Sequence, residues 1–411
     1  MEIYLVGGTV RDKLLGLPTK DNDWLVIGET SESMIQQGFR PVGKDFPVFL
    51  HPHTQEEYAL ARLERKTAPG YKGFEVNAAP DVSLEQDLLR RDLTINAMAM
   101  SPTGQLIDPY RGQRDLEQRV FRHISPAFAE DPVRILRVAR FAARYHHLGF
   151  TLAEETRTLM QAMVEAGEVD YLVPERVWAE LLKALNEKSP SAFFYTLQAC
   201  HALEKIFPEI HNLFGVPQPE KYHPEIDTGL HTLLCLEQAA LLSSKPEVRF
   251  AALVHDLGKA LSPKENWPHH HGHEQNGLPI LEQLCARIRA PNNFKTLARQ
   301  VIEYHTHCHK AFELRAATIT DLLTALGAFK PANTTLTDFL LACTADARGR
   351  TGLEHTPYEQ TVFLSGAAEA AAAIDTKPIL QSNLQGSAIG EAIRQLRIQA
   401  VAGFINQQSP R

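Results

Sequence analysis

The chain has 411 residues, of which 44% are hydrophobic and 22% charged, and this composition is typical of a soluble globular protein with about two to four domains. Its formal net charge of −7 argues against a protein that binds nucleic acid over its whole surface, so any basic patch must be local. No apolar run approaches the roughly 18 residues of a membrane span, no signal peptide precedes the first strand-like segment, and five scattered cysteines form no C-x-x-C pair, so we expect a cytoplasmic protein.

The first predicted elements are a strand, a glycine turn and a helix. Residues 3–6 are apolar, Gly7-Gly8 interrupts them, and residues 10–15 are apolar at helical spacing. Glycines at such a turn let backbone N–H groups face an anion, and Arg11 follows immediately. The pattern predicts a turn that binds phosphate.

Two aspartates follow, Asp21 and Asp23, and the apolar run 24–27 comes directly after them. If that run is a strand, residues two apart share a face, so both carboxylates point the same way. Paired carboxylates near a phosphate site suit a magnesium–triphosphate complex. Each motif alone is weak, because Gly-Gly is usually only a turn and Asp-x-Asp is often a solvated loop edge. Their order and close spacing favour a nucleotide site.

The string Gly7-Gly8-x-Val10-Arg11-Asp12-x-Leu14-Leu15-Gly16 leading to Asp21-x-Asp23 closely resembles the signature of the class II tRNA nucleotidyltransferases. These are the CCA-adding enzymes and their poly(A) polymerase relatives, in the polymerase-β-like superfamily. The resemblance implies that Gly8 and Arg11 bind the nucleotide and that Asp21 and Asp23 hold the catalytic magnesium.

The region up to about residue 107 has short segments divided by Gly and Pro, which predicts a mixed sheet with strands at 47–50, 57–62 and 74–76 and a mobile loop over 62–74. Arg90-Arg91-Asp92 then lies in a helix-like run, where two arginines could simply be a solvated helix end. By resemblance, Arg91 matches the nucleotide-binding arginine, and Asp92 either orients Arg91 or contacts the ribose.

A polar segment over residues 108–116 resembles the family's linker and is predicted to be a hinge. Glu130-Asp131-Pro132 then predicts a helix start, with acids at its positive end and proline in its first turn. Between Arg111 and Arg144 there are eight arginines against four acids, which is a local basic patch.

Asp131 and Arg134 have a specific chemistry when they lie one turn apart. Cytosine and adenine both present an amino donor beside a ring-nitrogen acceptor, so a carboxylate and a guanidinium can pair with either base. Uracil and guanine present a carbonyl where the amino group would be, so the same pair rejects them. By resemblance this pair is the family's Glu-Asp-x-x-Arg amino-acid template, and Arg137 and Arg140 match positions that contact nucleotide.

Residues 150–213 are predicted to form amphipathic helices without chemistry of their own, and by resemblance they are the neck and body that hold the tRNA acceptor arm. After them, nine of the eighteen histidines fall between His231 and His309. A lone His-Asp pair is weak evidence, but a histidine, an adjacent His-Asp and a late aspartate resemble the HD phosphohydrolase pattern. Imidazoles with carboxylates suit a divalent transition metal that activates water. The predicted ligands are His231, His255, Asp256 and Asp346, with His273 and His305 as possible additional ligands.

We therefore predict an α+β protein with a small mixed-sheet nucleotidyltransferase head, an all-helical neck and body, and a helical HD domain. The predicted domains are 1–140 (head with its nucleotide-binding helix), 141–225 (neck and body that bind tRNA), 226–350 (HD phosphohydrolase) and 351–411 (C-terminal helices). The predicted activity is template-independent addition of C, C and A to tRNA from CTP and ATP with Mg²⁺. The predicted second activity is hydrolysis of 2′,3′-cyclic phosphates and 2′-nucleotides with Ni²⁺, Mn²⁺ or Co²⁺. No membrane and no obligate protein partner is expected.

Three other functions share part of this pattern. A poly(A) polymerase has the same head, but such relatives typically carry longer basic tails and are not expected to carry this HD domain. A CC-adding enzyme is altered in the loop before Arg-Arg-Asp, and residues 62–74 have full length in this chain. An HD phosphohydrolase whose front half only binds RNA has no use for the pair Asp21 and Asp23. A CCA-adding enzyme with an HD domain fits the whole pattern best.

Overall fold

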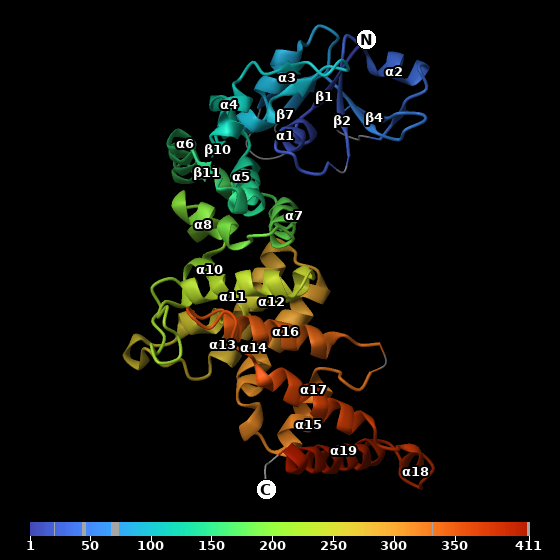
Figure 1. The fold of residues 1–411 in the computed structure, drawn as a ribbon, viewed down its shortest axis with the longest axis vertical. Helices are drawn as coiled ribbons and strands as arrows, with labels where there is room; N and C mark the ends of the chain where they lie inside the picture. The colour runs from blue at the N-terminus through green and yellow to red at the C-terminus, as the bar shows by residue number, and fades with distance from the viewer. Residues whose placement is uncertain (20, 43–46, 67–73, 331, 409–411) are drawn as a thin grey trace. The chain divides into compact units, whose positions relative to one another are not determined.

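The computed structural model describes residues 1–19, 21–42, 47–66, 74–330 and 332–408 (Figure 1). The chain forms two compact units, Met1–Ala184 with Ala192–Ile206, and Leu185–Ser191 with Phe207–Arg411. The predicted borders at 140, 225 and 350 stay predictions, although the first of them lies inside a helix, α5 (Val133–Tyr145).

A mixed seven-stranded sheet in the order β3-β4-β5-β2-β1-β8-β9 is the centre of the first unit (Figure 1, blue). The pair β2–β5 is parallel and the other pairs are antiparallel, so the predicted small mixed-sheet head is confirmed. Its strands are β1 (Glu2–Val6), β2 (Asp23–Ile27), β3 (Arg40–Pro41), β4 (Val48–Leu50), β5 (Glu57–Leu60), β8 (Ala99–Met100) and β9 (Leu106–Ile107).

Both faces of the sheet are covered. Successive side chains of its central strand β2 point to opposite faces, and each face packs into its own buried cluster. Leu25 of β2 belongs to a buried cluster with Leu88, whereas its neighbour Val26 belongs to another with Met34. The helices of this unit are α1 (Gly8–Leu14), α2 (Ser31–Gln36), α3 (Leu84–Leu89), α4 (Gly112–Glu117), α5, α6 (Glu154–Glu165), α7 (Pro174–Leu185), α8 (Ser191–Ala199) and α9 (Leu203–Ile206). Short 3₁₀ turns are η1 (Thr94–Asn96), η2 (Pro126–Glu130), η3 (His146–Leu148) and η4 (Glu168–Tyr171).

Two smaller strand pairs accompany the sheet. β6 (Leu63–Lys66) and β7 (Phe74–Asn77) form an antiparallel pair, as expected for strands on either side of a loop. The sequence predicts the loop over residues 62–74, and residues 67–73 of it lie outside the described residues. β10 (Val120–Phe121) and β11 (Thr151–Leu152) form a parallel pair.

Helix α5 starts where the sequence predicts. Pro132 is its N-cap residue, and the carboxylate of Asp131 accepts a hydrogen bond from the Val133 amide at 3.0 Å. This bond satisfies one of the amide donors that a helix start leaves free. One face of the helix is fully buried through Ile135 and Leu136, and Arg134 is also buried. Arg137, Arg140 and Arg144 are partly exposed.

The second unit is all-helical, as predicted (Figure 1, yellow to red). Its helices are α10 (Pro208–His211), α11 (Thr228–Leu242), α12 (Pro246–Val254), α13 (His273–Ile288), α14 (Asn292–His309), α15 (Ala316–Ala325), α16 (Thr335–Arg348), α17 (Glu359–Ala372), α18 (Lys377–Leu380) and α19 (Ser387–Gln408). Its 3₁₀ turns are η5 (Leu257–Leu261), η6 (Lys264–Asn266) and η7 (Ala311–Glu313). Across the part of the chain that the structure describes, none of the helices combines the length and apolarity needed to cross a membrane.

Small side chains let α11, α12 and α16 approach one another closely. Ala239, Ala252 and Ala345, one from each helix, form a fully buried cluster. Gly349, just after α16, fits directly against Cys235 of α11, since a Cβ on this glycine would lie 2.5 Å from the sulfur. The cysteines are all free and buried, as expected from their scattered positions.

Candidate functional site

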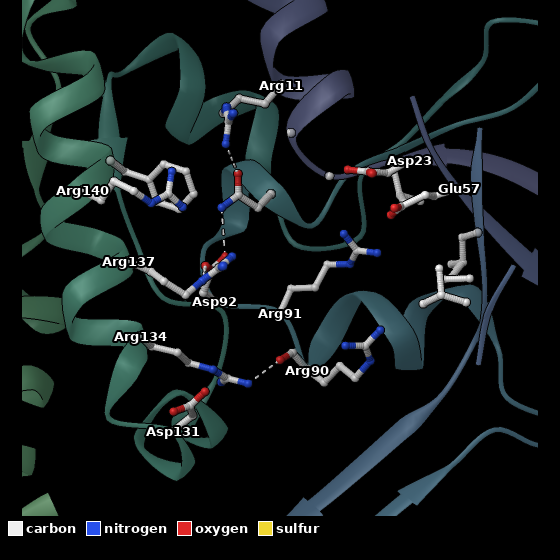
Figure 2. Close-up of a pocket in the computed structure, with 18 of the residues that line it drawn as sticks. Arg11, Asp23, Glu57, Arg90, Arg91, Asp92, Asp131, Arg134, Arg137 and Arg140 are labelled. Carbon is white, nitrogen blue, oxygen red and sulfur yellow. Dashed lines mark hydrogen bonds and ion pairs between the residues drawn. The ribbon is translucent and has the colours of Figure 1, made fainter. Parts of the chain in front are cut away.

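A cavity of about 1230 Å³ in the first unit collects most of the predicted nucleotide site (Figure 2). Its lining comes from β1, the start of α1, β2, β5, the end of α3, α5 and α7. The predicted residues that line it are Gly8, Arg11, Asp23, Arg91, Asp92, Asp131, Arg134, Arg137 and Arg140. Asp21 is the one predicted head residue outside this lining.

The two predicted metal ligands differ in their positions. β2 begins at Asp23, whereas Asp21 lies two residues earlier in the preceding loop, so the prediction that one strand carries both is wrong. The strand begins one residue before the predicted run and does not extend back to Asp21, whose backbone carbonyl accepts a hydrogen bond from Thr9 of α1 at 2.7 Å. The two carboxylates still interact: burial raises the pKa of Asp23, Arg91 opposes this, and the charge of Asp21 adds to it. A bound cation would stabilise the charged form of the Asp23 carboxylate.

Glu57 supplies a further carboxylate that the sequence did not single out. The parallel pairing of β2 with β5 sets Glu57 opposite Asp23, and both line the cavity side by side (Figure 2). The strand 57–62 was predicted, but a sequence does not say which strand lies next to it. Clustered carboxylate oxygens fit a hard divalent cation.

The glycine turn lines the cavity beside two arginines. Gly7 precedes α1 with φ +69°, and a Cβ there would lie 2.9 Å from a guanidinium nitrogen of Arg91. A Cβ on Gly8 would lie 3.3 Å from the guanidinium of Arg11. Two arginines therefore approach the turn closely only because it has no side chains. Arg91 is itself paired with Asp87, at 3.1 Å.

A relay of hydrogen bonds connects Arg11 to α5 (Figure 2). Arg11, which is 3% exposed, donates to the Asn96 side-chain oxygen at 2.5 Å, and Asn96 donates to Asp92 at 2.9 Å. Asp92 also accepts from Arg137 at 2.7 Å. Burial opposes its charge, but Arg137 and the other donors lower the pKa of Asp92 well below its usual value. Asp92 thus orients Arg137; the prediction that it might orient Arg91 is corrected, because the carboxylate beside Arg91 is Asp87.

The predicted base-reading residues, Asp131 and Arg134, line the cavity, and hydrogen bonds to other protein groups fix their positions. Arg134 donates to the backbone carbonyls of Ala127 at 2.8 Å and Arg90 at 2.6 Å. Asp131 lies just before α5 and accepts from both terminal nitrogens of Arg176, at 3.2 and 2.9 Å. A fixed carboxylate and a fixed guanidinium can distinguish pairing edges only if their positions are rigid, and these contacts provide that rigidity.

Helix α7 contributes residues that the sequence interpretation missed. The segment that contains it was predicted to have no chemistry of its own, yet Arg176 holds Asp131, and Glu180 pairs with Arg140 at 2.6 Å. Arg176 and Glu180 are four residues apart and share a helix face. That spacing was visible, but the sequence does not say that this face meets the arginines of α5.

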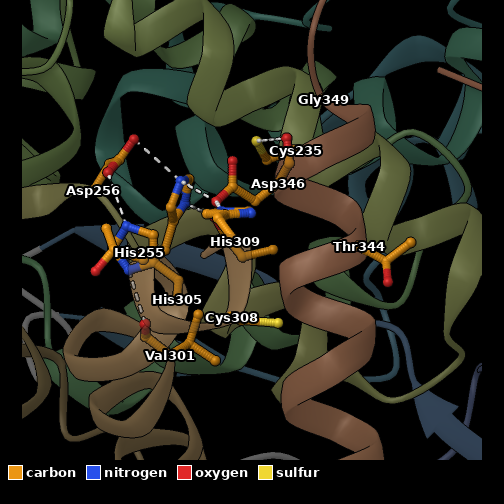
Figure 3. Close-up of polar contacts among 12 residues, drawn as sticks. Cys235, His255, Asp256, Val301, His305, Cys308, His309, Thr344, Asp346 and Gly349 are labelled. Carbon is orange, nitrogen blue, oxygen red and sulfur yellow. Dashed lines mark hydrogen bonds and ion pairs between the residues drawn. The ribbon is translucent and has the colours of Figure 1, made fainter. Parts of the chain in front are cut away.

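A second cavity, of about 730 Å³, lies in the second unit beside the predicted HD ligands. The elements α11, α12, α13, α14 and α16, with the start of η5, bring all six predicted residues together. Figure 3 labels four of them, His255, Asp256, His305 and Asp346. His231 lies 3.2 Å from Asp346, His255 lies 3.1 Å from Asp256, and His273 lies 3.2 Å from His305, each measured between side-chain atoms.

The histidines are tethered in a common way. The Nδ1 atoms of His255, His273 and His305 bond to backbone carbonyls at 2.8, 2.8 and 3.0 Å. Nδ1 therefore carries the proton when the ring is neutral, and Nε2 faces the centre. The buried Nε2 of His255 and Oδ1 of Asp256 have no hydrogen-bond partner among the described residues. These atoms face one another across the centre, with His255 Nε2 3.1 Å from Asp256 Oδ2 and His273 Nε2 3.5 Å from Asp256 Oδ1. Inward-facing imidazole nitrogens and carboxylate oxygens of this kind fit a divalent transition metal.

The charges at this centre are strongly coupled. Burial disfavours a charged His255, but Asp256 and Asp346 outweigh it and raise the pKa of His255 to about 9. Burial and the charge of His255 lower the pKa of His305 to about 3. A metal that binds His255 has to displace its proton, since a ligand histidine is neutral.

Four further residues surround the ligands and were not predicted. Glu225 lies 3.0 Å from Nδ1 of His231, Lys259 lies 2.7 Å from Asp256, and His309 lies 2.6 Å from Asp346. Tyr358 in turn bonds to His309 at 2.8 Å. Lys259 follows His255-Asp256 within one helical turn, so its position near the ligands could have been predicted from the sequence. Nothing in the sequence around Glu225 or Tyr358 indicates that they lie at this centre.

Three family profiles match the chain in order. They are the Poly A polymerase head domain over residues 3–122, the "Probable RNA and SrmB- binding site of polymerase A" over residues 149–214, and the HD domain over residues 228–327. Asp346 lies beyond the third match, although the structure places it at the same centre.

Curated relatives match along the whole length. The multifunctional CCA protein of Methylococcus capsulatus is 63% identical over 410 residues, which covers 100% of this chain and 96% of the relative. The multifunctional CCA protein of Teredinibacter turnerae is 58% identical over 411 residues, with 100% of both chains covered.

Solved structures share the fold at lower identity. A CCA-adding enzyme in complex with CTP has a TM-score of 0.64 at 22% identity, covering 97% of this chain and 87% of the other. A Thermotoga maritima CCA-adding enzyme complexed with tRNA has a TM-score of 0.62 at 20% identity, covering 99% and 92%. At such identities the likeness shows the fold alone.

Proposed function

The chain belongs to the multifunctional CCA proteins, and from this premise we propose that its two cavities carry out two separate reactions. The head adds C, C and A to the 3′ end of tRNA from CTP and ATP. The HD domain hydrolyses phosphate esters. The observation that carries the proposal is the difference in donor sets: carboxylates with arginines in one cavity, histidines with carboxylates at the other.

In the head, Asp23 and Glu57, with Asp21 beside them, would hold a divalent cation, which we propose to be magnesium. When bound, such a cation activates the 3′-hydroxyl for in-line attack and neutralises charge on the triphosphate. Arg91 and Arg11, next to the glycine turn, bind the triphosphate. The relay through Asn96 and Asp92 keeps Arg11 and Arg137 in position before the nucleotide arrives. Asp87 does the same for Arg91.

Base selection belongs to Asp131 and Arg134. The carboxylate accepts a hydrogen bond from the amino group of cytosine or adenine, and the guanidinium donates to the adjacent ring nitrogen. Arg176 holds the carboxylate and backbone carbonyls hold the guanidinium, so the pair cannot turn to suit uracil or guanine. One site can then accept both CTP and ATP.

In the HD domain, His231, His255, Asp256 and Asp346 would hold a transition metal, with His273 and His305 close enough to add ligands. When bound, the metal supplies an activated water. Lys259 and Arg350 line the adjacent cavity and can bind the phosphate of a substrate, which we propose to be a 2′,3′-cyclic phosphate or a 2′-nucleotide. Trimming of damaged tRNA ends before CCA is rebuilt would link the two reactions. The predicted cytoplasmic location suits a tRNA substrate and stays a prediction.

The test supplies the purified protein with tRNA that lacks its 3′ end, with CTP, ATP or both, and resolves products by length. Three added nucleotides, in the order C, C, A, are expected with both nucleotides. A long adenosine tail would indicate a poly(A) polymerase, and a stop after two residues would indicate a CC-adding enzyme. Binding without extension would contradict the proposal for the head. A parallel assay with a 2′,3′-cyclic nucleotide and Ni²⁺, Mn²⁺ or Co²⁺ tests the HD domain.

A further inference from the structure

Asp12 is a buried carboxylate of the glycine-turn motif that the proposed function does not use. It lies on α1 directly after Arg11 and is 6% exposed. Its carboxylate accepts hydrogen bonds from Nε of Arg11 at 2.8 Å, from Nη2 of Arg144 at 2.8 Å and from the hydroxyl of Tyr145 at 2.6 Å. Arg144 and Tyr145 are the last two residues of α5. One buried carboxylate therefore brings together two guanidiniums from different helices.

The two guanidiniums share an aromatic surface as well as a carboxylate. The guanidinium carbons of Arg11 and Arg144 lie 5.0 and 5.3 Å from the centre of the Tyr145 ring, which is fully buried. Over such distances a cation is attracted to the face of an aromatic ring. Asp12 and Tyr145 thus fix both arginines before any ligand binds.

The charges at this point are not balanced. Asp12 supplies one negative charge, whereas Arg11 and Arg144 supply two positive charges. The further partner of Arg11 is the side chain of Asn96, which is neutral. Because Arg11 is 3% exposed, water screens its charge only weakly. A buried excess of positive charge is unfavourable unless an anion compensates it, so the arrangement fits a negatively charged ligand.

Both guanidiniums reach the nucleotide cavity. Arg11 and Arg144 belong to its lining, and the Arg144 side chain is 35% exposed. Arg11 uses Nε and Nη1 for Asp12 and Asn96. Its Nη2 lies at the glycine turn, 3.3 Å from where a Cβ on Gly8 would be. Arg144 reaches Asp12 through Nη2, and a guanidinium carries five N–H donors, so the pair offers N–H groups to an anion beside the turn.

Arg144 lies at the opposite end of the cavity from the base-reading pair. It follows Arg134 by ten residues on the same helix, which is a rise of about 15 Å. Figure 2 shows Asp131 and Arg134 near the start of this helix and Arg11 on the opposite side of the cavity. A nucleotide whose base pairs with Asp131 and Arg134 extends its phosphates toward Arg11 and the glycine turn. Its terminal phosphates then come next to Arg144.

We propose that Arg11 and Arg144, held together by Asp12, bind the β- and γ-phosphates of the incoming nucleotide and the pyrophosphate that leaves. The proposal rests on the head activity proposed above. In that reaction the 3′-hydroxyl oxygen of the tRNA forms a bond to the α-phosphorus, and its proton leaves to water. The bond from the α-phosphorus to the bridging oxygen breaks, and this oxygen keeps the electron pair and departs with the pyrophosphate. Guanidiniums fixed beside the departing group stabilise the negative charge that develops on it.

The test is the affinity of the full-length protein for CMP, CTP and inorganic pyrophosphate, measured by calorimetry with Mg²⁺ present. The wild type is expected to bind CTP more tightly than CMP. Arg144→Ala should lower the affinity for CTP and for pyrophosphate about ten-fold or more, because charge-assisted hydrogen bonds to phosphate are lost. Its affinity for CMP should not change, since CMP lacks the β- and γ-phosphates.

Three further variants separate the contributions of charge and position. Arg144→Lys keeps the positive charge and should recover part of the lost affinity for pyrophosphate. Tyr145→Phe keeps the ring and loses the hydroxyl that donates to Asp12, so it should weaken CTP and pyrophosphate binding less than Arg144→Ala does. Arg157→Ala removes an exposed arginine of α6 whose partner is Glu154, and as the matched control it should bind all three ligands like the wild type.

The outcomes separate this proposal from the proposed function. An equal loss of affinity for CMP, CTP and pyrophosphate in Arg144→Ala would overturn the role of Arg144 in phosphate binding, because the residue would then only support the cavity. Unchanged affinity for CTP and pyrophosphate would overturn it as well, and weaker tRNA binding in the same variant would assign Arg144 to the RNA backbone. If the wild type binds no CTP, the head activity itself is contradicted and this proposal fails with it.

Discussion

The two cavities differ in how they use their polar atoms. In the head, Arg134 and Arg137 already donate to protein oxygens, so their positions are set before a ligand binds. At the HD centre, Nε2 of His255 and Oδ1 of Asp256 are buried and lack a hydrogen-bond partner among the described residues. The first arrangement suits an extended anion, recognised by groups held from behind. The second suits a single ion that completes the bonding of several inward-facing atoms.

The largest effects should come from removing one metal site at a time. Asp23→Ala is expected to lower CCA addition on the order of 1000-fold or more, because a catalytic metal contributes several kcal/mol. Asp21→Ala should also abolish addition, and Glu57→Gln should lower it less. His255→Ala or Asp256→Ala should remove hydrolysis to a similar degree. Both reactions are measured on the same preparation of each variant, and each variant should keep the other reaction.

If Asp23→Ala and His255→Ala each lose both activities, the proposal of two separate active sites is contradicted. The two cavities would then share a site or depend on each other for folding. Metal dependence offers an independent check after removal of all metals with a chelator: Mg²⁺ should restore addition, whereas hydrolysis should require Ni²⁺, Mn²⁺ or Co²⁺.

Substitutions of the base-reading pair should act on selectivity. Asp131→Ala or Arg134→Ala should relax discrimination against UTP and GTP roughly ten- to a hundred-fold, since each unpaired polar contact costs about 1–3 kcal/mol. Single-turnover incorporation of all four nucleotides measures this. A uniform loss of rate for every nucleotide would mean that these residues only support the helix.

A smaller effect is expected at Arg176, which holds Asp131 from α7. Arg176→Ala should raise misincorporation by about ten-fold or less, because Asp131 keeps its hydrogen bond to the Val133 amide. Arg157→Ala removes an exposed arginine whose partner is Glu154, and it serves as the control. If Arg176→Ala slows CTP and ATP addition without any change in selectivity, Arg176 does not position the base-reading carboxylate.

The smallest effect on rate should come from the cores of the two units. Met34→Ala, in the head, should destabilise that unit by about 2–5 kcal/mol while the rate of addition at 25 °C changes little. Leu323→Ala is the counterpart in the second unit, where it is fully buried. Thermal inactivation of each reaction provides the measurement. Addition should fail at a lower temperature in Met34→Ala only, and hydrolysis in Leu323→Ala only; a joint shift in either variant would show that the units unfold together.

The sequence predicted those features that depend on neighbours along the chain. The glycine turn at Gly7, the start of α5 after Pro132 and the all-helical second half follow from local geometry, because a turn or a helix start is specified within a few residues. The residues proposed as HD ligands were also recognisable, since residue type and order point to metal chemistry before any contact is known. These predictions needed no knowledge of which elements pack together.

The tertiary structure decided the contacts between distant elements. Only the pairing of β2 with β5 brings Glu57 beside Asp23, and only the packing of α7 against α5 brings Arg176 to Asp131. Asp92 could not be assigned to Arg137 from the sequence, because their hydrogen bond spans 45 residues. Periodicity reports which face of an element is buried but not what that face meets, so the residues that position the chemistry became visible only in the folded chain.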